Sequence, residues 1–274
     1  MLSRKIGIDL GSSTVRIFVK GEGVVVNEPS GKATLPHLIG KANGRPRLFR
    51  PDVVVSVPSA VTSGERRAVT EAAMSAGARQ VWLIDEPLAA AMGAGLPIAD
   101  ARASAICELG AATTEVAVIS LSGTVAARSI GVGGRALDAA LAARFGLGEP
   151  EAEQVKVAVG SAMPMGEPLV TTVRGVEISS NDVAAAIAEP LRLIASAIGD
   201  VVRELPRPLA ADVRERGIVL SGGGAQLRRL PVYITDATGI PAVVAEEPQT
   251  TVVRGTGVAL DSFEVLKRNQ SYLR

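Results

Sequence analysis

The sequence predicts an α/β protein made of two similar units. An apolar run ending in Asp9-Leu10-Gly11 recurs, without a gap, as a run ending in Glu108-Leu109-Gly110. In both copies two small residues, a threonine and a second apolar run follow. Strand patterns then alternate with patterns of helical period, which is typical of α/β folds. With 274 residues, 47% of them hydrophobic, the chain can bury two cores.

The first unit is predicted to span residues 1–102. Its expected elements are strands at 5–10, 14–20, 23–28, 51–58 and 80–85, and helices at 65–76 and 86–95. The near-continuous β-branched run at 51–58 is typical of a strand covered on both faces. Thr62 and Glu65 have capping-box spacing, Gly77 provides a helix stop, and Pro87 suits the first turn of the next helix.

The second unit is predicted to span residues 103–256. Its expected elements are strands at 104–110, 113–121, 124–132 and before the glycines at 222–224, and helices at 134–145, 150–162, 181–205 and 225–238. Pro190 should kink or divide its helix, and Pro231 should break the helix that contains it. A final helix, about 257–274, is expected to return to the first unit.

Composition excludes several classes of function. The 29 basic and 28 acidic side chains nearly cancel, so no basic field favours a nucleic-acid partner. No apolar leader or span is evident, and a cytoplasmic location is expected. Cys107 and His37 are the only residues of their types, which excludes an internal disulfide and a two-histidine metal site. Cys107 is expected to be buried in a strand, and His37 to lie in a solvated loop.

The repeated turn has the chemistry of a phosphate site. A strand-end acid, a glycine turn and a threonine together offer a carboxylate for hydrated Mg²⁺ and backbone N–H groups for phosphate oxygens. Two such turns facing each other would hold a polyphosphate from both sides. A third turn, Gly222-Gly223-Gly224, follows a strand and allows close backbone approach to a ligand.

Several long stretches resemble the bacterial actin-like MreB/Mbl family, in order and over most of the chain. They are IGIDLGSSTVRIFVKGEGVVVNEPS, VPSAVTSGERRAVTEAAMSAGARQVWLIDEPLAAAMGAGLP, TTEVAVISLSG and RGIVLSGGGAQLRRLP. The resemblance implies an actin-like ATPase fold, with two RNase H-like domains around a cleft for ATP or ADP and Mg²⁺. It also implies membrane-associated filaments concerned with cell shape.

The resemblance assigns site residues by position. The implied nucleotide-binding residues are Asp9, Gly11, Ser12, Ser13, Thr14, Gly110, Ala111, Ala112, Thr113, Thr114, Gly133, Gly134, Glu153, Lys156, Gly222, Gly223, Gly224 and Ala225. Asp9 and Glu108 would hold the metal. Glu86 matches the acid that orients the attacking water, with Thr113 as the second catalytic residue. Without the resemblance, Glu86 would be interpreted as a helix N-terminal acid stabilised by the helix dipole.

The second loop departs from the family, where it resembles Asp-Ile-Gly-Gly-Gly-Thr-Thr-Glu. Glu108 is one methylene longer than aspartate, and Mg²⁺ demands near-ideal octahedral geometry. Ala111 and Ala112 add Cβ atoms, and an alanine forced to positive φ would cost roughly 1–2 kcal/mol. We therefore expect nucleotide binding with weak or no ATP hydrolysis.

A second departure concerns a small subdomain of the first unit, which is reduced to a short connection near 31–46. The second small subdomain, near 135–183, is also trimmed. We expect impaired self-polymerisation. As alternative roles, the protein would co-assemble with a full-length MreB-like protein or regulate that protein. A small-molecule kinase of the same superfold is the main enzyme alternative. Leu48 and Phe49, among arginines, resemble the family's membrane-touching loop.

Overall fold

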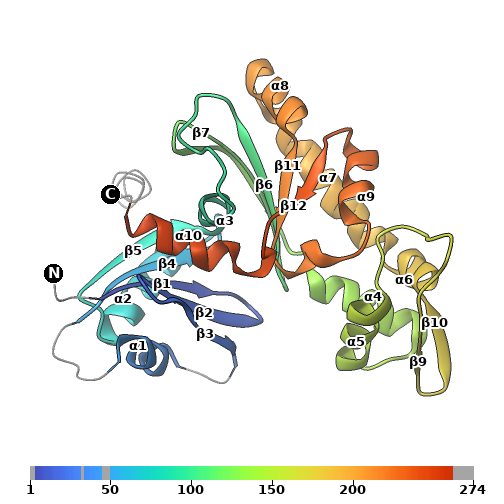
Figure 1. The fold of residues 1–274 in the computed structure, drawn as a ribbon, viewed down its shortest axis with the longest axis horizontal. Helices are drawn as coiled ribbons and strands as arrows, with labels where there is room; N and C mark the ends of the chain where they lie inside the picture. Colours follow the sequence, from blue (N-terminus) through green and yellow to red (C-terminus); the bar gives the residue numbers. More distant parts are fainter. Residues whose placement is uncertain (1–3, 32–33, 45–49, 262–274) are drawn as a thin grey trace.

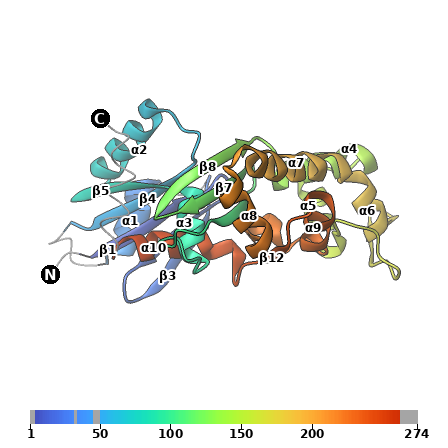
Figure 2. The ribbon, with the colours of Figure 1, turned by 90° about the horizontal axis from the view of Figure 1, so that it is seen from above.

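Two lobes, each built on a mixed five-stranded sheet, form the protein (Figure 1). The computed structural model describes residues 4–31, 34–44 and 50–261, so Leu48 and Phe49 lie outside the described residues. The first sheet has the order β3-β2-β1-β4-β5, and the second β12-β11-β6-β7-β8. The lobes lie side by side along the long axis (Figure 2). None of the described helices is long and apolar enough to span a bilayer.

The first lobe follows the predicted order of elements. It contains β1 (Lys5–Leu10), β2 (Thr14–Val19), β3 (Gly23–Pro29), α1 (Leu35–Asn43), β4 (Asp52–Val57), α2 (Ser63–Ser75), β5 (Gln80–Asp85) and α3 (Glu86–Gly93). Val53 and Val55 of β4 pack in the core beneath α1 and α2, whereas Val54 packs in a core on the opposite face. The prediction that this strand is covered on both faces is confirmed.

The remaining elements belong to the second, longer lobe, except α10, which packs against the first. They are β6 (Ser104–Leu109), β7 (Thr114–Ser120), β8 (Gly123–Ile130), α4 (Gly134–Phe145), α5 (Glu149–Val159), β9 (Val170–Val173), β10 (Val176–Ser179), α6 (Ser180–Ala186), α7 (Ala188–Glu204), α8 (Arg207–Arg216), β11 (Ile218–Ser221), η1 (Gly223–Gln226), α9 (Leu230–Thr238), β12 (Ala242–Val244), η2 (Pro248–Thr250) and α10 (Thr251–Ala259). Cys107 of β6 is fully buried, as predicted.

The sequence repeat is also a repeat of strand pairing. β1 is antiparallel to β2 and parallel to β4, and β6 is antiparallel to β7 and parallel to β11. In this register Asp9 lies opposite Arg16 and Glu108 lies opposite Glu115. Both repeated acids therefore stand near the carboxyl end of a strand, immediately before a glycine turn.

Local capping and proline rules hold at several predicted boundaries. The Glu65 N–H donates to Thr62 Oγ1 at 3.3 Å, and the Thr62 N–H donates to Glu65 Oε2 at 2.8 Å, which completes the predicted capping box of α2. Gly77 follows the helix with φ of 106°. α6 and α7 separate at Ile187, three residues before Pro190, because the proline ring nitrogen cannot continue the helical ladder.

Two sequence expectations are wrong. The stretch around His37 is a helix, α1, rather than a loop, because Leu38 and Ile39 pack into the first core while His37 stays exposed. Pro231 begins a helix instead of breaking one: a 3₁₀ turn precedes it, and the proline occupies the first turn of α9. At that position no intrahelical N–H is required.

Helices α3 and α10 form a layer between the two sheets. α10 follows the second lobe in sequence but packs on α3 and on strands of the first sheet (Figure 1). A Cβ on Gly93 would lie 1.8 Å from the Thr251 carbonyl oxygen, and one on Gly255 would lie 1.7 Å from that of Ala89. The two backbones therefore touch, and this contact couples the lobes.

Candidate functional site

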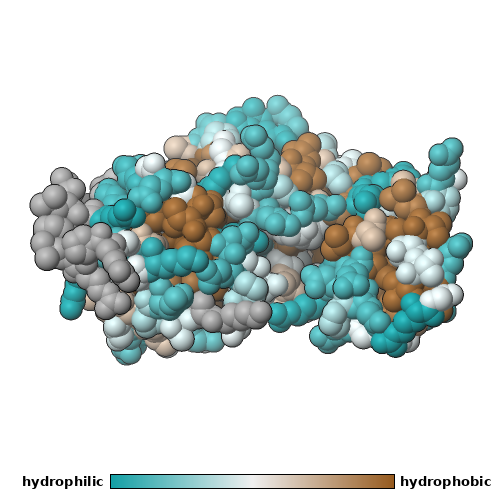
Figure 3. Space-filling view, turned by 60° about the horizontal axis from the view of Figure 1, so that its bottom comes forward, coloured by the Kyte–Doolittle hydropathy of each residue, from teal (hydrophilic) through white to brown (hydrophobic). Residues whose placement is uncertain are grey.

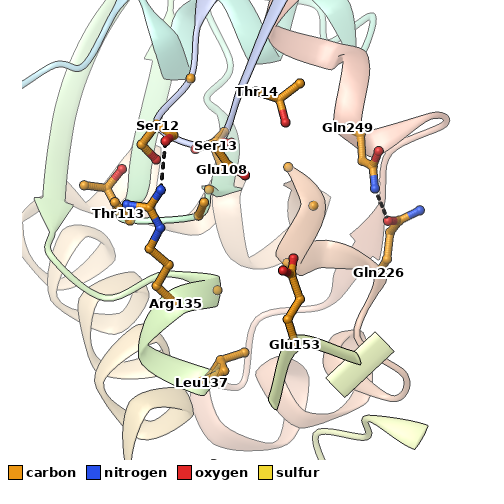
Figure 4. Close-up of a pocket in the computed structure, with 18 of the residues that line it drawn as sticks. Ser12, Ser13, Thr14, Glu108, Thr113, Arg135, Leu137, Glu153, Gln226 and Gln249 are labelled. Carbon is orange, nitrogen blue, oxygen red and sulfur yellow. Dashed lines mark hydrogen bonds between the residues drawn. The ribbon is translucent and has the colours of Figure 1, made fainter. Parts of the chain in front are cut away.

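A cleft of about 670 Å³ lies between the lobes, where the repeated turns face each other. Figure 3 looks onto this face, where the surface is hollowed between the two lobes. The close-up in Figure 4 shows the Ser12–Thr14 loop on one side of the cavity and Arg135 and Glu153 entering from α4 and α5. Elements from both ends of the sequence thus build one site.

The two repeated turns leave little room for a side chain at the same glycine position. A Cβ on Gly11 would lie 2.7 Å from the Thr14 carbonyl oxygen, and one on Gly110 would lie 3.1 Å from that of Thr113. The Gly110 N–H donates to the Thr113 carbonyl at 2.9 Å, which closes the second turn. Both turns bring backbone and a threonine to the cleft wall.

The expected strain at the two alanines is absent. Ala111 and Ala112 are not among the described residues with positive φ, so the loop turns without entering the left-handed region. Both residues line the cleft. Their effect on a ligand therefore comes from methyl groups on the wall and not from stored backbone energy.

Gly222 lets the third turn approach the second. Its φ is 80°, and a Cβ there would lie 2.3 Å from the Leu109 carbonyl oxygen and 2.6 Å from Glu108 Oε1. No other residue type fits both the backbone conformation and the space. Gly223 has open space and, like Gly224, lines the cleft.

Most of the predicted site residues line the cleft. These are Asp9, Gly11, Ser12, Ser13, Thr14, Glu86, Glu108, Gly110, Ala111, Ala112, Thr113, Gly134, Glu153, Lys156, Gly222, Gly223 and Gly224. Lys156 is already paired, because its Nζ lies 2.7 Å from Asp138 Oδ1 and donates to the Gly134 carbonyl at 3.2 Å. Its charge holds α5 against α4, while Glu153 points into the cavity (Figure 4).

Three predicted contact residues lie behind the wall instead. The buried Thr114 hydroxyl donates to the Val132 carbonyl at 2.6 Å. Gly133 packs against the second turn, since a Cβ there would lie 2.7 Å from the Gly110 carbonyl oxygen. Ala225 is only 1% exposed and belongs to the core of the second lobe. These residues support the loops and do not line the cleft.

Three carboxyl groups crowd the floor of the cleft. Asp9, Glu86 and Glu108 are each less than a tenth exposed. Burial raises the pKa of Asp9 to about 6, although Arg16 works against this rise. Burial, followed by the charges of Asp9 and Glu115, raises the pKa of Glu108 to about 8. Burial and then Glu108 and Asp9 raise the pKa of Glu86 to about 9.

Sequence reasoning missed several charged residues at or behind the cleft wall, among them Arg16, Glu115 and Arg135. Arg16 Nη1 lies 3.7 Å from Asp9 Oδ2, and Arg16 lines the cleft. Glu115, at the matching position of the second copy, is fully buried and accepts the Ser59 N–H on both carboxylate oxygens. Arg135 Nη2 donates to the Ser12 carbonyl at 2.9 Å across the cleft (Figure 4). The repeat itself pointed to the first two, because it aligns Arg16 with Glu115.

Comparison with known proteins identifies the family. A model of the MreB/Mbl protein family matches residues 31–268. The chain belongs to this family. The cell shape-determining protein MreB of Escherichia coli K12 is 38% identical over 331 positions, covering 97% of this chain and 95% of the relative. The cell shape-determining protein Mbl of Bacillus subtilis 168 is 30% identical, covering 98% of this chain and 99% of the relative.

Solved structures agree with this assignment to the MreB/Mbl family. Crystal structures of MreB5 of Spiroplasma citri bound to ADP and to AMPPNP both superpose with a TM-score of 0.89 at 25% identity, covering 98% of this chain. The MamK double helical filament superposes with a TM-score of 0.77 at 18% identity, which shows the fold alone. The predicted actin-like ATPase fold is confirmed.

The donor set of this MreB/Mbl-family cleft fits a cation that arrives with phosphates. No three ligand side chains among the described residues are grouped closely enough to hold a metal by themselves. Mg²⁺ typically takes one or two carboxylates and completes its shell with water and phosphate oxygens. Asp9 and Glu108 supply two carboxylates at a floor where acids outnumber bases.

The raised pKa values predict that the ligand-free protein loses stability as pH rises. Ordinary unfolded carboxyls ionise near pH 4.3, so between that pH and about 9 the folded state binds more protons than the unfolded state. The free energy of unfolding should fall across this range. The unfolding temperature of the wild-type protein should drop from pH 6 to pH 9. In the Glu108→Gln variant this drop should be roughly 2–6 °C smaller than in the wild type.

Thermal unfolding followed by circular dichroism at both pH values measures this difference. Glu177→Gln, at an exposed position of β10, is the matched control and should keep the wild-type pH dependence. An unchanged pH dependence in Glu108→Gln would contradict the charge crowding described here.

Proposed function

We propose that this MreB/Mbl-family protein binds ATP or ADP in the cleft and acts as an actin-like cytoskeletal protein in determining cell shape. The observation that carries this proposal is the duplicated turn: two glycine loops, each after a strand-end acid, face each other across one cleft. The nucleotides bound to MreB5 and the names of the MreB and Mbl relatives support it. Family membership favours this role over a small-molecule kinase.

The phosphates would lie between the two repeated turns, with adenosine toward Gly222–Gly224 and Glu153. Backbone N–H groups and the hydroxyls of Ser12, Ser13 and Thr14 suit phosphate oxygens. Asp9 and Glu108 would hold Mg²⁺, which when bound neutralises phosphate charge and fixes its orientation. The excess of carboxylates on the cleft floor supports this assignment.

Hydrolysis should be slow because the second loop departs from the family pattern. Glu86 would orient the attacking water. Ala111 and Ala112 present methyl groups next to Thr113, and Glu108 extends further than aspartate would. Water, phosphate and acid must be aligned closely for transfer, so small displacements reduce the rate strongly.

The triple change Glu108→Asp, Ala111→Gly, Ala112→Gly should raise ATP turnover about fivefold to tenfold, which corresponds to roughly 1–1.4 kcal/mol of activation free energy. It should also lower the unfolding temperature, since each glycine frees the unfolded backbone. Phosphate release under saturating ATP and Mg²⁺ measures the rate.

Adding Glu86→Ala to the triple variant provides the control and should reduce turnover about a hundredfold. If the unmodified protein already turns over ATP as fast as the triple variant, the second loop does not limit hydrolysis.

A two-domain organisation underlies the assembly proposal. We propose residues 1–102 and 103–256 as the domains, with a C-terminal helix at about 257–274 returning to the first; residues 262–274 lie outside the described residues. Between β3 and β4 the described chain contains α1 alone. The alignment with Escherichia coli MreB spans 331 positions against 274 residues here, so at least 57 positions, the difference, have no counterpart in this chain. The single helix between β3 and β4 supports a reduced small subdomain, near 31–46, and less area for longitudinal contacts.

We expect the purified protein with ATP to remain monomeric, or to form short oligomers, at concentrations where full-length relatives form filaments. Mixed with a full-length MreB, it should enter the pellet in proportion to that partner. Sedimentation and negative-stain electron microscopy provide the measurement, with nucleotide-free samples as the control. Long, straight filaments of the protein alone would show that the reduced region is dispensable for assembly.

Membrane contact through Leu48 and Phe49 remains a separate proposal. Burying each side chain in a lipid surface would contribute roughly 1.5–3 kcal/mol, and assembly would multiply the contact. The double change Leu48→Ser, Phe49→Ser should therefore reduce cosedimentation with anionic liposomes about tenfold or more. Unchanged cosedimentation of a correctly folded double variant would assign these residues a structural role instead.

A further inference from the structure

The two halves of the site differ in charge at one matched pair of positions. In the first copy the cross-strand partner of Asp9 is Arg16, and in the second copy the partner of Glu108 is Glu115. Pairing of opposite charges across neighbouring strands is favourable, whereas like charges directly opposite are unfavourable. The matched position therefore carries a positive side chain in the first copy only.

Glu115 and Arg16 also face different surroundings. Glu115 is fully buried, is held by the Ser59 N–H at 3.1 and 3.2 Å, and does not line the cleft. Arg16 lines the cleft, and its side chain is 15% exposed. Its Nε is buried and has no hydrogen-bond acceptor among the described residues. The side chain of Arg16 thus borders the cleft, although its Nε is closed off from it.

Arg16 makes the one ion pair that reaches the acidic floor within the described part of the chain. Asp9 pairs with it at 3.7 Å, and neither Glu86 nor Glu108 has an ion-pair partner there. The other cations on the cleft wall have partners of their own: Lys156 pairs with Asp138, Arg135 donates to the Ser12 carbonyl, and Arg228 donates to the Gly160 carbonyl. A polyphosphate entering this cleft meets three carboxyl groups and needs compensating positive charge nearby.

We propose that the Arg16 guanidinium supplies part of the positive charge that a bound polyphosphate requires. Less of that charge then has to come from Mg²⁺. Guanidinium N–H groups form strong, directional hydrogen bonds with phosphate oxygens and carry a permanent charge. Arg16 therefore lowers the dependence of nucleotide binding on divalent metal. This inference rests on the proposed nucleotide binding, and it concerns how that binding is achieved.

The test compares the dissociation constant of a fluorescent ADP analogue in Mg²⁺ with that in EDTA. The wild-type protein should bind in both, and the ratio of its dissociation constant in EDTA to that in Mg²⁺ should stay below about ten. Arg16→Met should raise the ratio by a further factor of about ten, the typical worth of a charge-assisted hydrogen bond, mainly by weakening binding in EDTA. Arg16→Lys, which keeps the charge, should stay within about threefold of the wild-type ratio.

Lys20→Met is the matched control, because Lys20 directly follows the same strand, pairs with Asp261 and does not line the cleft. It should leave the ratio unchanged. Arg16→Gln serves as a second neutral variant in case Arg16→Met fails to fold, as judged by circular dichroism. It should raise the ratio in the same direction.

Two outcomes would overturn this inference alone: a neutral Arg16 variant with the wild-type ratio, or one that weakens binding equally with and without Mg²⁺. Absence of analogue binding to the wild-type protein in saturating Mg²⁺ would instead overturn the proposed nucleotide binding, and this inference with it.

Discussion

Repulsion among buried carboxyl groups is the constraint around which this site is organised. Asp9, Glu86 and Glu108 come from three different elements and meet on a floor that is less than a tenth exposed. Burial penalises each charge, and proximity penalises the second and third further. Such a floor is unfavourable in the free protein and becomes favourable when a cation joins it. The three carboxyl groups thus lower the folding stability of the free protein and at the same time provide the groups that can bind a cation.

Close backbone packing allows this unfavourable floor to persist. The Gly222 turn lies against Leu109 and Glu108, and the α3–α10 contact at Gly93 and Gly255 holds the lobes together. Contacts of this kind leave no room for a side chain, so the strand ends cannot move apart without losing many others. The arginine bridge from Arg135 to the Ser12 loop adds a polar link across the cleft opening. Nucleotide entry must therefore be compatible with that link or replace it.

The proposed function combines a nucleotide cleft with a reduced first lobe. The walls of the cleft come from strand ends and helix starts, which the repeat duplicates in both lobes. Filament contacts in an actin-like protein depend instead on its peripheral surface. The area of those contacts can change without changing the geometry of the cleft. Loss of peripheral segments can thus leave ligand binding intact while changing the partners with which the protein assembles.

Local patterns in the sequence determined much of this protein. The repeat predicted paired strands with an acid before each glycine turn, the capping box predicted the start of α2, and an apolar run predicted buried Cys107. These features depend on residues that are close in the chain, or on a duplication visible in it. The duplication also pointed to the two loops that face the cleft, whereas Glu86, Gly134, Glu153 and Lys156 were assigned to it only through the family resemblance.

Tertiary structure alone decided which of these groups act at the cleft and which support it. Thr114, at a site-like position, turns inward because the Val132 carbonyl accepts its hydroxyl. Lys156 is occupied because α4 brings Asp138 beside it, and α1 forms because the first core receives its apolar face. Arg16 and Glu115 occupy equivalent strand positions, yet only Arg16 reaches the cleft. Each outcome depends on partners distant in sequence, whose positions local patterns do not encode.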